Sequence, residues 1–303
     1  MKPPLISICI AAYNAEKYLE ATLRSVLSQT YKNWELIVIE DSSKDRTEEL
    51  VTDFSLKVPQ TVVYGHHSQN SGLAATRNTS MERASGEWVA FLDADDLWKP
   101  EHLEMLVSAS QIETCDGIFS GSVEYDDATW TKLSTHFPSD RDLIDLPVAI
   151  YTGRLVIVAS AVMVARKAFE RFGPISPEFS VCSDTEYLLR ILSMSGRLMF
   201  SGANTCIYRQ HSRGLSSDVA KSLIESARVC ERYSNWNAIP RLLARARTAS
   251  LYRTAGSALL KEHPDEALEP LAQSLRLHPF SPKTIGLWAK ALLNQGHKRQ
   301  RAA

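Results

Sequence analysis

The sequence predicts an α/β protein, an αβα sandwich with a mostly parallel sheet, followed by an all-helical C-terminal region. In the first 125 residues, short apolar runs alternate with amphipathic stretches, which is typical of β-α-β units with helices on both faces of a sheet. Beyond about residue 216 the apolar runs stop and helical periodicity continues alone. We therefore expect residues 1–217 to form one domain and residues 218–303 to form a helical region.

The expected elements of the first domain follow in order. Residues 5–10 form a buried strand, and Leu19, Leu23 and Val26 then recur at helical spacing. Residues 34–39 form the next strand, which a turn and a helix to about residue 54 follow. The same reasoning predicts strands at 61–64, 88–92, 118–123, 156–164 and 205–208, and helices at 73–84 and 184–195.

The C-terminal region contains four amphipathic stretches separated by prolines and glycine. Residues 264–279 resemble one helix of a tetratricopeptide-like hairpin, but a single unit is too little to indicate a repeat array. The predicted helices are residues 222–233, 240–261, 264–277 and 281–293.

The composition fits a folded protein of this class. Among 303 residues, 44% are hydrophobic, and 34 Lys and Arg stand against 35 Asp and Glu, which excludes intrinsic disorder, collagen and coiled coil as descriptions of the whole chain. No apolar run approaches the ~20 residues that a membrane-spanning helix needs, and the N-terminus lacks the apolar core of a signal peptide. We expect a cytoplasmic protein with no nucleic-acid partner.

The cysteines predict neither a disulfide framework nor a zinc site. They are far apart, odd in number and without CxxC or Cys/His spacing. Buried, reduced thiols are therefore expected. They are Cys9, Cys115, Cys182, Cys206 and Cys230.

The near-neutral total conceals a charge split. Residues 221–303 hold 14 Lys and Arg and 6 Asp and Glu, a balance of +8, which leaves −9 for residues 1–220. A basic helical surface attracts anionic lipid headgroups, such as those on the inner face of the cell membrane, or an acidic glycan. A solvated face packed against the acidic domain explains the same charge, and both interpretations stay open. The basic residues include Arg241, Arg245, Arg247, Arg253, Lys298, Arg299 and Arg301.

Three carboxylates follow the apolar strand at residues 88–92, namely Asp93, Asp95 and Asp96. Like charges this close repel unless a cation lies between them. Such a strand end suits Mg²⁺ or Mn²⁺ holding a diphosphate, because these ions take one or two carboxylates together with phosphate oxygens. The alternative is a solvated acidic turn with Asp96 as a helix cap. Ligands of α/β sheets bind outside the carboxyl ends of the strands, which favours the ligand site.

Four motifs together resemble family 2 glycosyltransferases in order and spacing. They are residues 8–14 (ICIAAYN), 36–47 (LIVIEDSSKDRT), 70–78 (NSGLAATRN) and 91–96 (FLDADD). The resemblance covers about residues 5–217. It implies the GT-A fold, a Rossmann-like sandwich, and an enzyme that transfers a sugar from a nucleotide diphosphate donor with inversion at the anomeric carbon.

The resemblance also implies which residues contact the nucleotide. Ala12, Tyr13 and Asn14 lie where the family holds the base. Asp41 resembles the carboxylate that accepts a hydrogen bond from the uracil ring nitrogen, and a carboxylate selects a base that presents an N–H because it only accepts. Glu40 departs mildly from the pair of aspartates common in the family. The alternative role for Asp41, an N-cap of the following helix, is compatible with the same geometry.

Further positions are matched around the acidic motif. Arg77 corresponds to the arginine that organises the base pocket and the acidic loop, and a purely structural pairing with an aspartate is the alternative. Asp93, Ala94 and Asp95 match the DxD motif that contacts the nucleotide-sugar. The resemblance makes Asp95 the metal ligand and places Asp93 closer to the donor ribose or sugar.

An inverting displacement needs a general base opposite the leaving diphosphate. The family takes this carboxylate from an acidic pair at the start of a helix ending in Arg, and residues 183–190 (SDTEYLLR) match that segment. Asp184 is therefore the implied base. Ser183 replaces the first acidic residue, which removes a neighbour that would raise the pKa of the base. Without the resemblance, Asp184 reads as an ordinary helix N-terminal acid.

Residues 207–216 (IYRQHSRGLS) resemble the loop that closes over the donor diphosphate in the family. His211 would complete the metal or phosphate shell there, so Asp95 and His211 are the predicted metal ligands, with Mn²⁺ or Mg²⁺ as cofactor. Arg209 or Arg213 would offset charge on the leaving group.

These observations predict an inverting glycosyltransferase that uses a UDP-sugar or another NDP-sugar and a glycan, lipid-linked or protein acceptor. The alternative from another class is a non-catalytic nucleotide-sugar binder that acts as an adaptor through its helical region. A dinucleotide-dependent oxidoreductase is disfavoured, because residues 11–14 lack the Gly-x-Gly-x-x-Gly that lets a pyrophosphate approach a helix.

Overall fold

The computed structural model describes residues 3–302, without the side chains of residues 262 and 295–302. The basic side chains expected at Lys298, Arg299 and Arg301 therefore lie outside the described part. The chain forms two compact units, one ending at Ser212 and one beginning at Arg213. The domain boundary that we predict follows residue 217.

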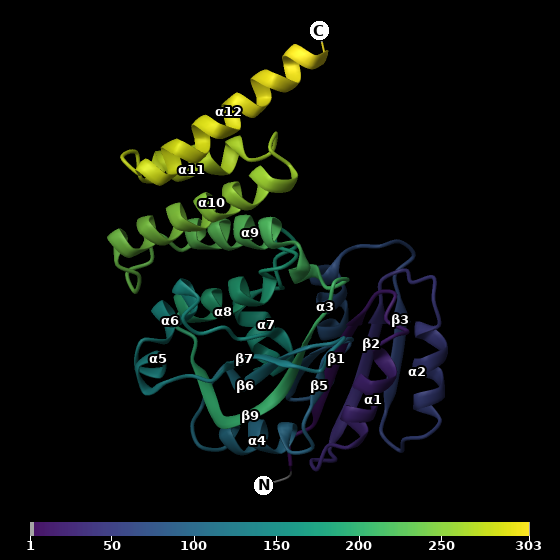
Figure 1. Cartoon of the computed structure of the whole chain (residues 1–303). Helices are drawn as coiled ribbons and strands as arrows, with labels where there is room; N and C mark the ends of the chain where they lie inside the picture. Colours follow the sequence, from purple (N-terminus) through teal and green to yellow (C-terminus); the bar gives the residue numbers. More distant parts are fainter. Residues whose placement is uncertain (1–2, 303) are drawn as a thin grey trace. The chain divides into compact units, whose positions relative to one another are not determined.

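The first half of the central sheet is parallel (Figure 1). Its ladders pair Ala11 with Asp93 and Ala12 with Glu40, so three predicted binding motifs reach the same edge. Nearly every residue of β1 and β2 is buried, as expected for parallel strands that helices cover on both faces. The strands, in spatial order, are β3 (Val62–His66), β2 (Trp34–Glu40), β1 (Ile6–Ala12) and β4 (Trp88–Asp93).

The second half of the sheet is mixed. β4 pairs antiparallel with β8, β8 with β6, and β9 with β5, whereas β6 and β9 run parallel. β7 forms a hairpin with β6. These strands are β8 (Val162–Ala165), β6 (Gly117–Asp126), β9 (Leu198–Gln210), β5 (Leu97–Trp98) and β7 (Lys132–His136).

The expected strand at residues 156–164 is shorter than predicted. A 3₁₀ turn, η1 (Ala159–Ala161), precedes β8. The Ser160 hydroxyl in this turn donates to Asp96 Oδ2 (2.5 Å) and accepts from the Asp93 backbone N–H (3.0 Å). The chain therefore leaves the strand conformation where it supports the acidic loop, and apolar patterning alone does not reveal this.

Helices cover the sheet, and the predicted α/β sandwich is confirmed. Three of them connect the parallel strands, and α8 brings its N-terminus to the site described below. They are α1 (Leu19–Leu27), α2 (Thr47–Ser55), α3 (Leu73–Glu82), α4 (His102–Ser110), α5 (Asp140–Ile144), α6 (Leu146–Thr152), α7 (Arg166–Phe172) and α8 (Ser183–Ser193).

The C-terminal unit is helical, as predicted. Leu259, Ala267, Leu271 and Ala291 form its small buried core, because successive helices pack side by side. Among the described residues, no helix combines the length and apolar character needed to cross a membrane. A short 3₁₀ turn, η2 (Leu215–Ser217), is followed by α9 (Val219–Arg232), α10 (Arg241–Glu262), α11 (Leu268–Leu277) and α12 (Pro282–Ala302).

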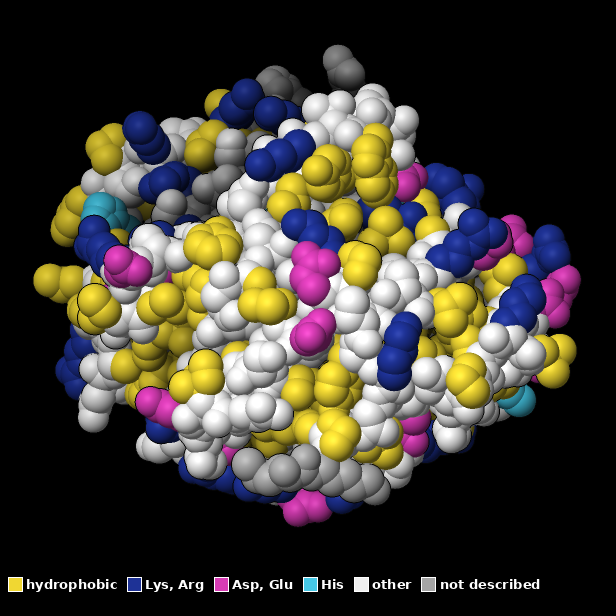
Figure 2. All heavy atoms as spheres, turned by 90° about the horizontal axis from the view of Figure 1, so that it is seen from below, with side chains coloured by type: hydrophobic (Ala, Val, Ile, Leu, Met, Phe, Trp, Pro, Cys, Tyr) yellow, Lys and Arg dark blue, Asp and Glu magenta, His cyan; other side chains and the backbone are white. Residues whose placement is uncertain are grey.

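Side chains of all kinds share the surface, and the cysteines lie inside the protein. On the face in Figure 2, apolar, basic and acidic side chains are interspersed. All five cysteines are buried, as expected for structural thiols.

Candidate active site

The loops after β1 and β2 interlock at the carboxyl edge of the sheet. The Asn14 N–H donates to Ser43 Oγ (2.9 Å), and the Lys44 N–H donates to Asn14 Oδ1 (3.0 Å). Asn14 and Ser42 both adopt positive φ, 46° and 65°, which is uncommon outside glycine. Ala12 is buried, whereas 55% of the Tyr13 side chain is exposed. The interlock therefore presents an aromatic side chain beside the strand ends.

Asp41 follows β2 and is only 3% exposed. Its Oδ1 accepts from the Ser71 N–H and contacts His67 Nδ1, both at 2.8 Å, and its Oδ2 accepts from the Gly72 N–H at 2.8 Å. A carboxylate offers about four acceptor positions, and these three contacts account for all but one position, on Oδ2. Asp41 thus fixes the loop before α3. Its partners Ser71 and Gly72 belong to the motif at residues 70–78, whereas His67 lies outside the four motifs.

Arg77 lies in α3 and joins two parts of the site. Its Nη2 donates to Asp93 Oδ1 (2.5 Å), and its Nη1 donates to Ser183 Oγ (3.2 Å) at the start of α8. Burial by itself would lower the pKa of this guanidinium, but Asp93 and Asp184 outweigh burial and raise the pKa. Ser183, the departure from the family pattern, therefore serves as a neutral acceptor for Arg77.

Asp184 occupies the first turn of α8 and is partly exposed. The Thr185 N–H donates to its Oδ1 (2.6 Å). Burial raises the pKa of this carboxyl, and Asp93 adds to the rise, whereas Arg77 and the Thr185 N–H oppose it. Asp184 lines a small pocket together with Arg77, Phe91, Ala159, Val162, Ile175, Tyr187 and Leu188.

The three carboxylates of the acidic loop have separate environments. Asp96 is fully buried, and it accepts from the Ser160 hydroxyl and from the Arg209 N–H (3.0 Å). Burial raises its pKa well above the usual range, with Asp95 and Asp93 adding to the rise. Asp93 is engaged by Arg77. The solvated-turn interpretation of Asp96 is therefore wrong, since Asp96 anchors the loop from inside.

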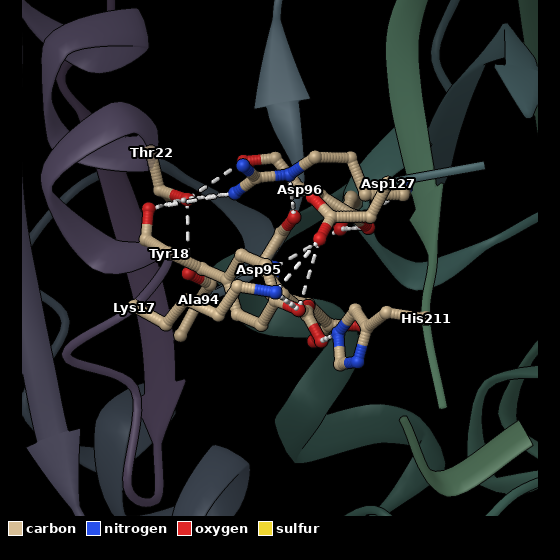
Figure 3. A network of polar contacts seen from close by, with 11 residues as sticks. Lys17, Tyr18, Thr22, Ala94, Asp95, Asp96, Asp127 and His211 are labelled. Carbon is tan, nitrogen blue, oxygen red and sulfur yellow. Dashed lines mark hydrogen bonds and ion pairs between the residues drawn. The ribbon is translucent and has the colours of Figure 1, made fainter. Parts of the chain in front are cut away.

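Asp95 is the most accessible carboxylate of this loop, with 34% of its side chain exposed. Its Oδ2 lies 3.0 Å from His211 Nε2, so the two predicted metal ligands lie together (Figure 3). The His211 ring stacks on Tyr18 at a centroid distance of 4.4 Å. Its Nδ1 is buried and lacks a hydrogen-bond partner among the described residues.

Asp95 and His211 fit a divalent cation that is shared with a bound ligand. No group of three or more His, Cys, Asp or Glu suited to a metal occurs among the described residues. A carboxylate and an imidazole supply two positions, and Mg²⁺ or Mn²⁺ commonly takes its remaining ligands from water and substrate phosphates. The pair therefore has the chemistry for a metal completed by a diphosphate.

Arg209 holds the acidic loop through its guanidinium. Nε donates to the Asp95 carbonyl, and Nη2 donates to the Tyr18 carbonyl (3.4 Å) and to Thr22 Oγ1 (3.3 Å). The guanidinium also lies 5.0 Å from the Tyr18 ring centroid. Burial lowers its pKa, although Asp96 and Asp95 counteract that effect. Ala94, from the same loop, is buried, and its carbonyl accepts from Thr22 Oγ1 (2.9 Å).

A second polar group beside the metal pair has no signal in the sequence. Lys17 Nζ lies 3.0 Å from Asp127 Oδ2 and 2.7 Å from the Tyr18 hydroxyl, which itself donates to Asp127 Oδ2 (3.1 Å) (Figure 3). Burial by itself would raise the pKa of Asp127, but Lys17 and Tyr18 lower it. The contact spans 110 residues, so no local motif indicates it.

Comparison with known proteins assigns the chain to the glycosyltransferases, the class that its sequence predicts. Residues 7–173 match the model of Glycosyl transferase family 2. This match covers more than half of the chain, so the chain belongs to glycosyltransferase family 2.

Relatives and solved structures agree with this family. WfgD of Escherichia coli, named a UDP-Glc:alpha-D-GlcNAc-diphosphoundecaprenol beta-1,3-glucosyltransferase, is 43% identical over 104 residues, 34% of this chain and 40% of WfgD. The segment matched to WfgD thus spans less than half of that relative. A second match, to a relative from Bacillus subtilis, spans 54% of that protein.

Two solved structures share the fold. S. aureus TarS 1-349 in complex with UDP-GlcNAc has a TM-score of 0.69 at 19% identity, covering 96% of this chain and 92% of that chain. The mannosyltransferase PcManGT from Pyrobaculum calidifontis, in complex with GDP-Man and Mn²⁺, has a TM-score of 0.64 at 18% identity, covering 96% of this chain and 86% of that chain. At these identities the likeness establishes the fold alone.

Proposed function

We propose that the protein is an inverting glycosyltransferase that takes its sugar from a UDP-sugar or another NDP-sugar, with Asp184 as general base. The observation that carries the proposal is the Arg77 bridge. One guanidinium contacts Asp93 of the acidic loop and Ser183 at the start of α8. One buried side chain thereby connects the acidic loop, which carries the proposed metal ligand Asp95, to the helix that carries the proposed general base Asp184.

The protein's own groups suit a single displacement. The acceptor hydroxyl oxygen forms the new bond to the anomeric carbon while the bond from that carbon to the diphosphate oxygen breaks. Asp184 takes the hydroxyl proton, and the nucleoside diphosphate leaves with the electron pair. A pKa raised by burial makes this carboxylate a stronger base than an ordinary surface aspartate.

Asp95 and His211 would hold the divalent cation. When bound, such an ion supplies charge stabilisation to the departing diphosphate. Arg209 then acts as a positioning residue, because its guanidinium contacts the Asp95 carbonyl rather than solvent. Tyr13 and the remaining acceptor position on Asp41 are proposed to bind the base, and Ala12 and Asn14 shape the loop that presents Tyr13.

The variant Asp184→Asn tests the base. We expect donor binding to persist and transfer to fall about 10²–10⁴-fold, the range for loss of general base catalysis. Binding is measured as a thermal shift with UDP-sugars and Mn²⁺, and transfer over a panel of glycan acceptors. Asp53→Asn, at an exposed position of α2, is the matched control. Full turnover in Asp184→Asn removes the proposed base, and donor binding without any turnover in the wild-type protein favours the adaptor alternative.

For the acceptor we propose a lipid-linked sugar. WfgD is named as a glucosyltransferase for a sugar linked to diphosphoundecaprenol. In this chain, the C-terminal unit exposes Phe280, Ile285 and Leu293 together with Lys283 and Lys290 on and before α12. Apolar and basic side chains on one helix suit the surface of an anionic membrane. The unit is therefore proposed to bind the inner face of the cell membrane.

Flotation with vesicles tests this part separately. We expect the protein to float with vesicles of phosphatidylglycerol and phosphatidylcholine at low salt, and to float less as salt screens the attraction. Vesicles of phosphatidylcholine alone are the control. A protein that stays at the bottom of the gradient with both vesicles at low salt contradicts membrane binding.

A further inference from the structure

The β6–β7 hairpin carries two stacked aromatic side chains, and one of them belongs to a residue with an unusual backbone conformation. Trp130 has φ +53° and is half exposed. A positive φ is a clear outlier for so bulky a residue, and such outliers cluster at ligand sites. The ring stacks on Tyr125 at a centroid distance of 5.1 Å with an interplanar angle of 18°. The two rings thus form a flat aromatic platform.

Hydrogen bonds fix the turn that presents this platform. The Trp130 N–H donates to the Asp126 carbonyl (2.8 Å), and the Asp126 N–H donates to the Thr131 carbonyl (2.9 Å). The Thr129 N–H and hydroxyl both donate to Asp126 Oδ1, at 2.8 and 2.7 Å. The exposed ring of Trp130 is therefore held in place rather than left to rotate with a loose loop.

The platform lies beside the metal pair. In the parallel ladder of β6 and β9, Tyr125 pairs with Arg209 and Asp126 with Gln210, so Tyr125 and Arg209 point to the same face of the sheet. The next residue, Asp127, donates its N–H to the Gln210 carbonyl (3.0 Å). Its carboxylate binds the hydroxyl of Tyr18, the ring on which His211 stacks.

We propose that Trp130, backed by Tyr125, binds the sugar ring of the acceptor carbohydrate. The negative face of an aromatic ring attracts the C–H groups on the apolar face of a pyranose. The predicted nucleobase contacts follow β1 and β2, and the two predicted metal ligands follow β4 and β9. The platform lies at the end of β6, which β4 and β8 separate from β1 in the strand order. A donor that spans from β2 to the metal pair leaves the β6 side to the acceptor. This assignment of the sugar as acceptor rests on the proposed function.

The first test measures the kinetics of Trp130→Ala and Trp130→Phe. We expect Trp130→Ala to raise the KM for the acceptor about tenfold, the loss of one stacking contact, and Trp130→Phe to recover most of that loss. The KM for the donor and acceptor-free hydrolysis of the donor stay unchanged. Leu133→Ala, in the same hairpin and equally exposed at 50%, is the matched control. An equal change in the donor KM assigns the platform to the donor sugar and overturns the proposal, as does an unchanged acceptor KM.

A second test does not depend on turnover. Saturation-transfer NMR measures binding of methyl glycosides of glucose and N-acetylglucosamine to the wild-type protein with UDP and Mn²⁺ present. Signals that disappear in Trp130→Ala but persist in Leu133→Ala support the platform, even if the wild-type protein transfers no sugar and the proposed function fails. Signals that persist in Trp130→Ala overturn the platform, whatever the activity.

Discussion

The carboxylates of the site fall into two sets that differ in how protein donors engage them. Asp41, Asp93 and Asp96 are engaged by protein donors, from the loop before α3, from Arg77, and from Ser160 with Arg209. Asp95 and Asp184 keep acceptor positions that protein donors do not fill, on the accessible side of the acidic loop and on α8. The engaged set builds the site, with one acceptor position of Asp41 left over, and Asp95 and Asp184 are the carboxylates available for the metal and for proton transfer.

Asp95→Ala should give the largest effect on activity. Loss of a metal ligand removes charge stabilisation worth several kcal/mol, so transfer should fall about 10³-fold. The side chain is exposed enough that the melting temperature should change little. Transfer assays across a Mn²⁺ titration, with thermal melts in parallel, check both expectations. Metal-dependent turnover at the wild-type rate in Asp95→Ala would show that Asp95 does not hold the cation.

Arg77→Met should give the largest effect on stability. Removal of one partner from a buried ion pair leaves Asp93 without its cation and costs about 3–5 kcal/mol. The methionine retains most of the apolar stem, so a packing defect contributes little. Urea unfolding measures the change, with Arg46→Met as control because the Arg46–Glu49 pair is exposed. A free energy of unfolding that matches the control would show that the bridge does not stabilise the fold.

The sequence predicts the position of these groups better than their roles. Apolar periodicity locates β1, β2 and β4, and parallel pairing then brings Ala12, Asp41 and Asp93 to one edge. The burial of Asp96 depends on the turn at Ser160, 64 residues away. The bond from Arg209 to the Asp95 carbonyl spans 114 residues. Partners this distant leave no pattern in a local window.

The C-terminal helical unit shows the same contrast between what the sequence predicts and what tertiary packing decides. The positions of the prolines and the helical periodicity predict its four helices, although α12 ends at Ala302 rather than at residue 293. Its helices pack around Leu271, and this packing depends on the close contact between Leu271 and Gly256. Periodicity indicates that Gly256 lies in a helix but does not indicate this contact. The sequence therefore predicts elements, whereas tertiary packing decides which of their faces remain exposed.

A pair of isosteric variants distinguishes the two sets by stability. Asp41→Asn should lower the free energy of unfolding by about 1–3 kcal/mol, because an amide accepts through one oxygen and leaves buried N–H donors unsatisfied. Asp184→Asn should leave it equal or raise it. The folded-state pKa of Asp184 is raised, so its ionisation costs stability as pH rises above the ordinary value of 3.8. Urea unfolding at neutral pH measures both, and a loss of stability in Asp184→Asn that equals the loss in Asp41→Asn contradicts the division.

The smallest expected effect is a shift in the pH profile of Ser183→Asp. Transfer requires ionised Asp184, so the rate rises with pH through the pKa of that carboxyl, which burial already raises. A second carboxylate at position 183 raises this pKa further by like-charge repulsion, although Arg77, 3.2 Å from the Ser183 hydroxyl, offsets part of the repulsion. The acid limb of kcat/KM should therefore move to higher pH by less than about one unit. Ser183→Asn, which adds no charge, should leave the limb where it is. An acid limb that is identical in both variants would indicate that the titrating base lies beyond the reach of residue 183, and Asp184 would lose its assignment.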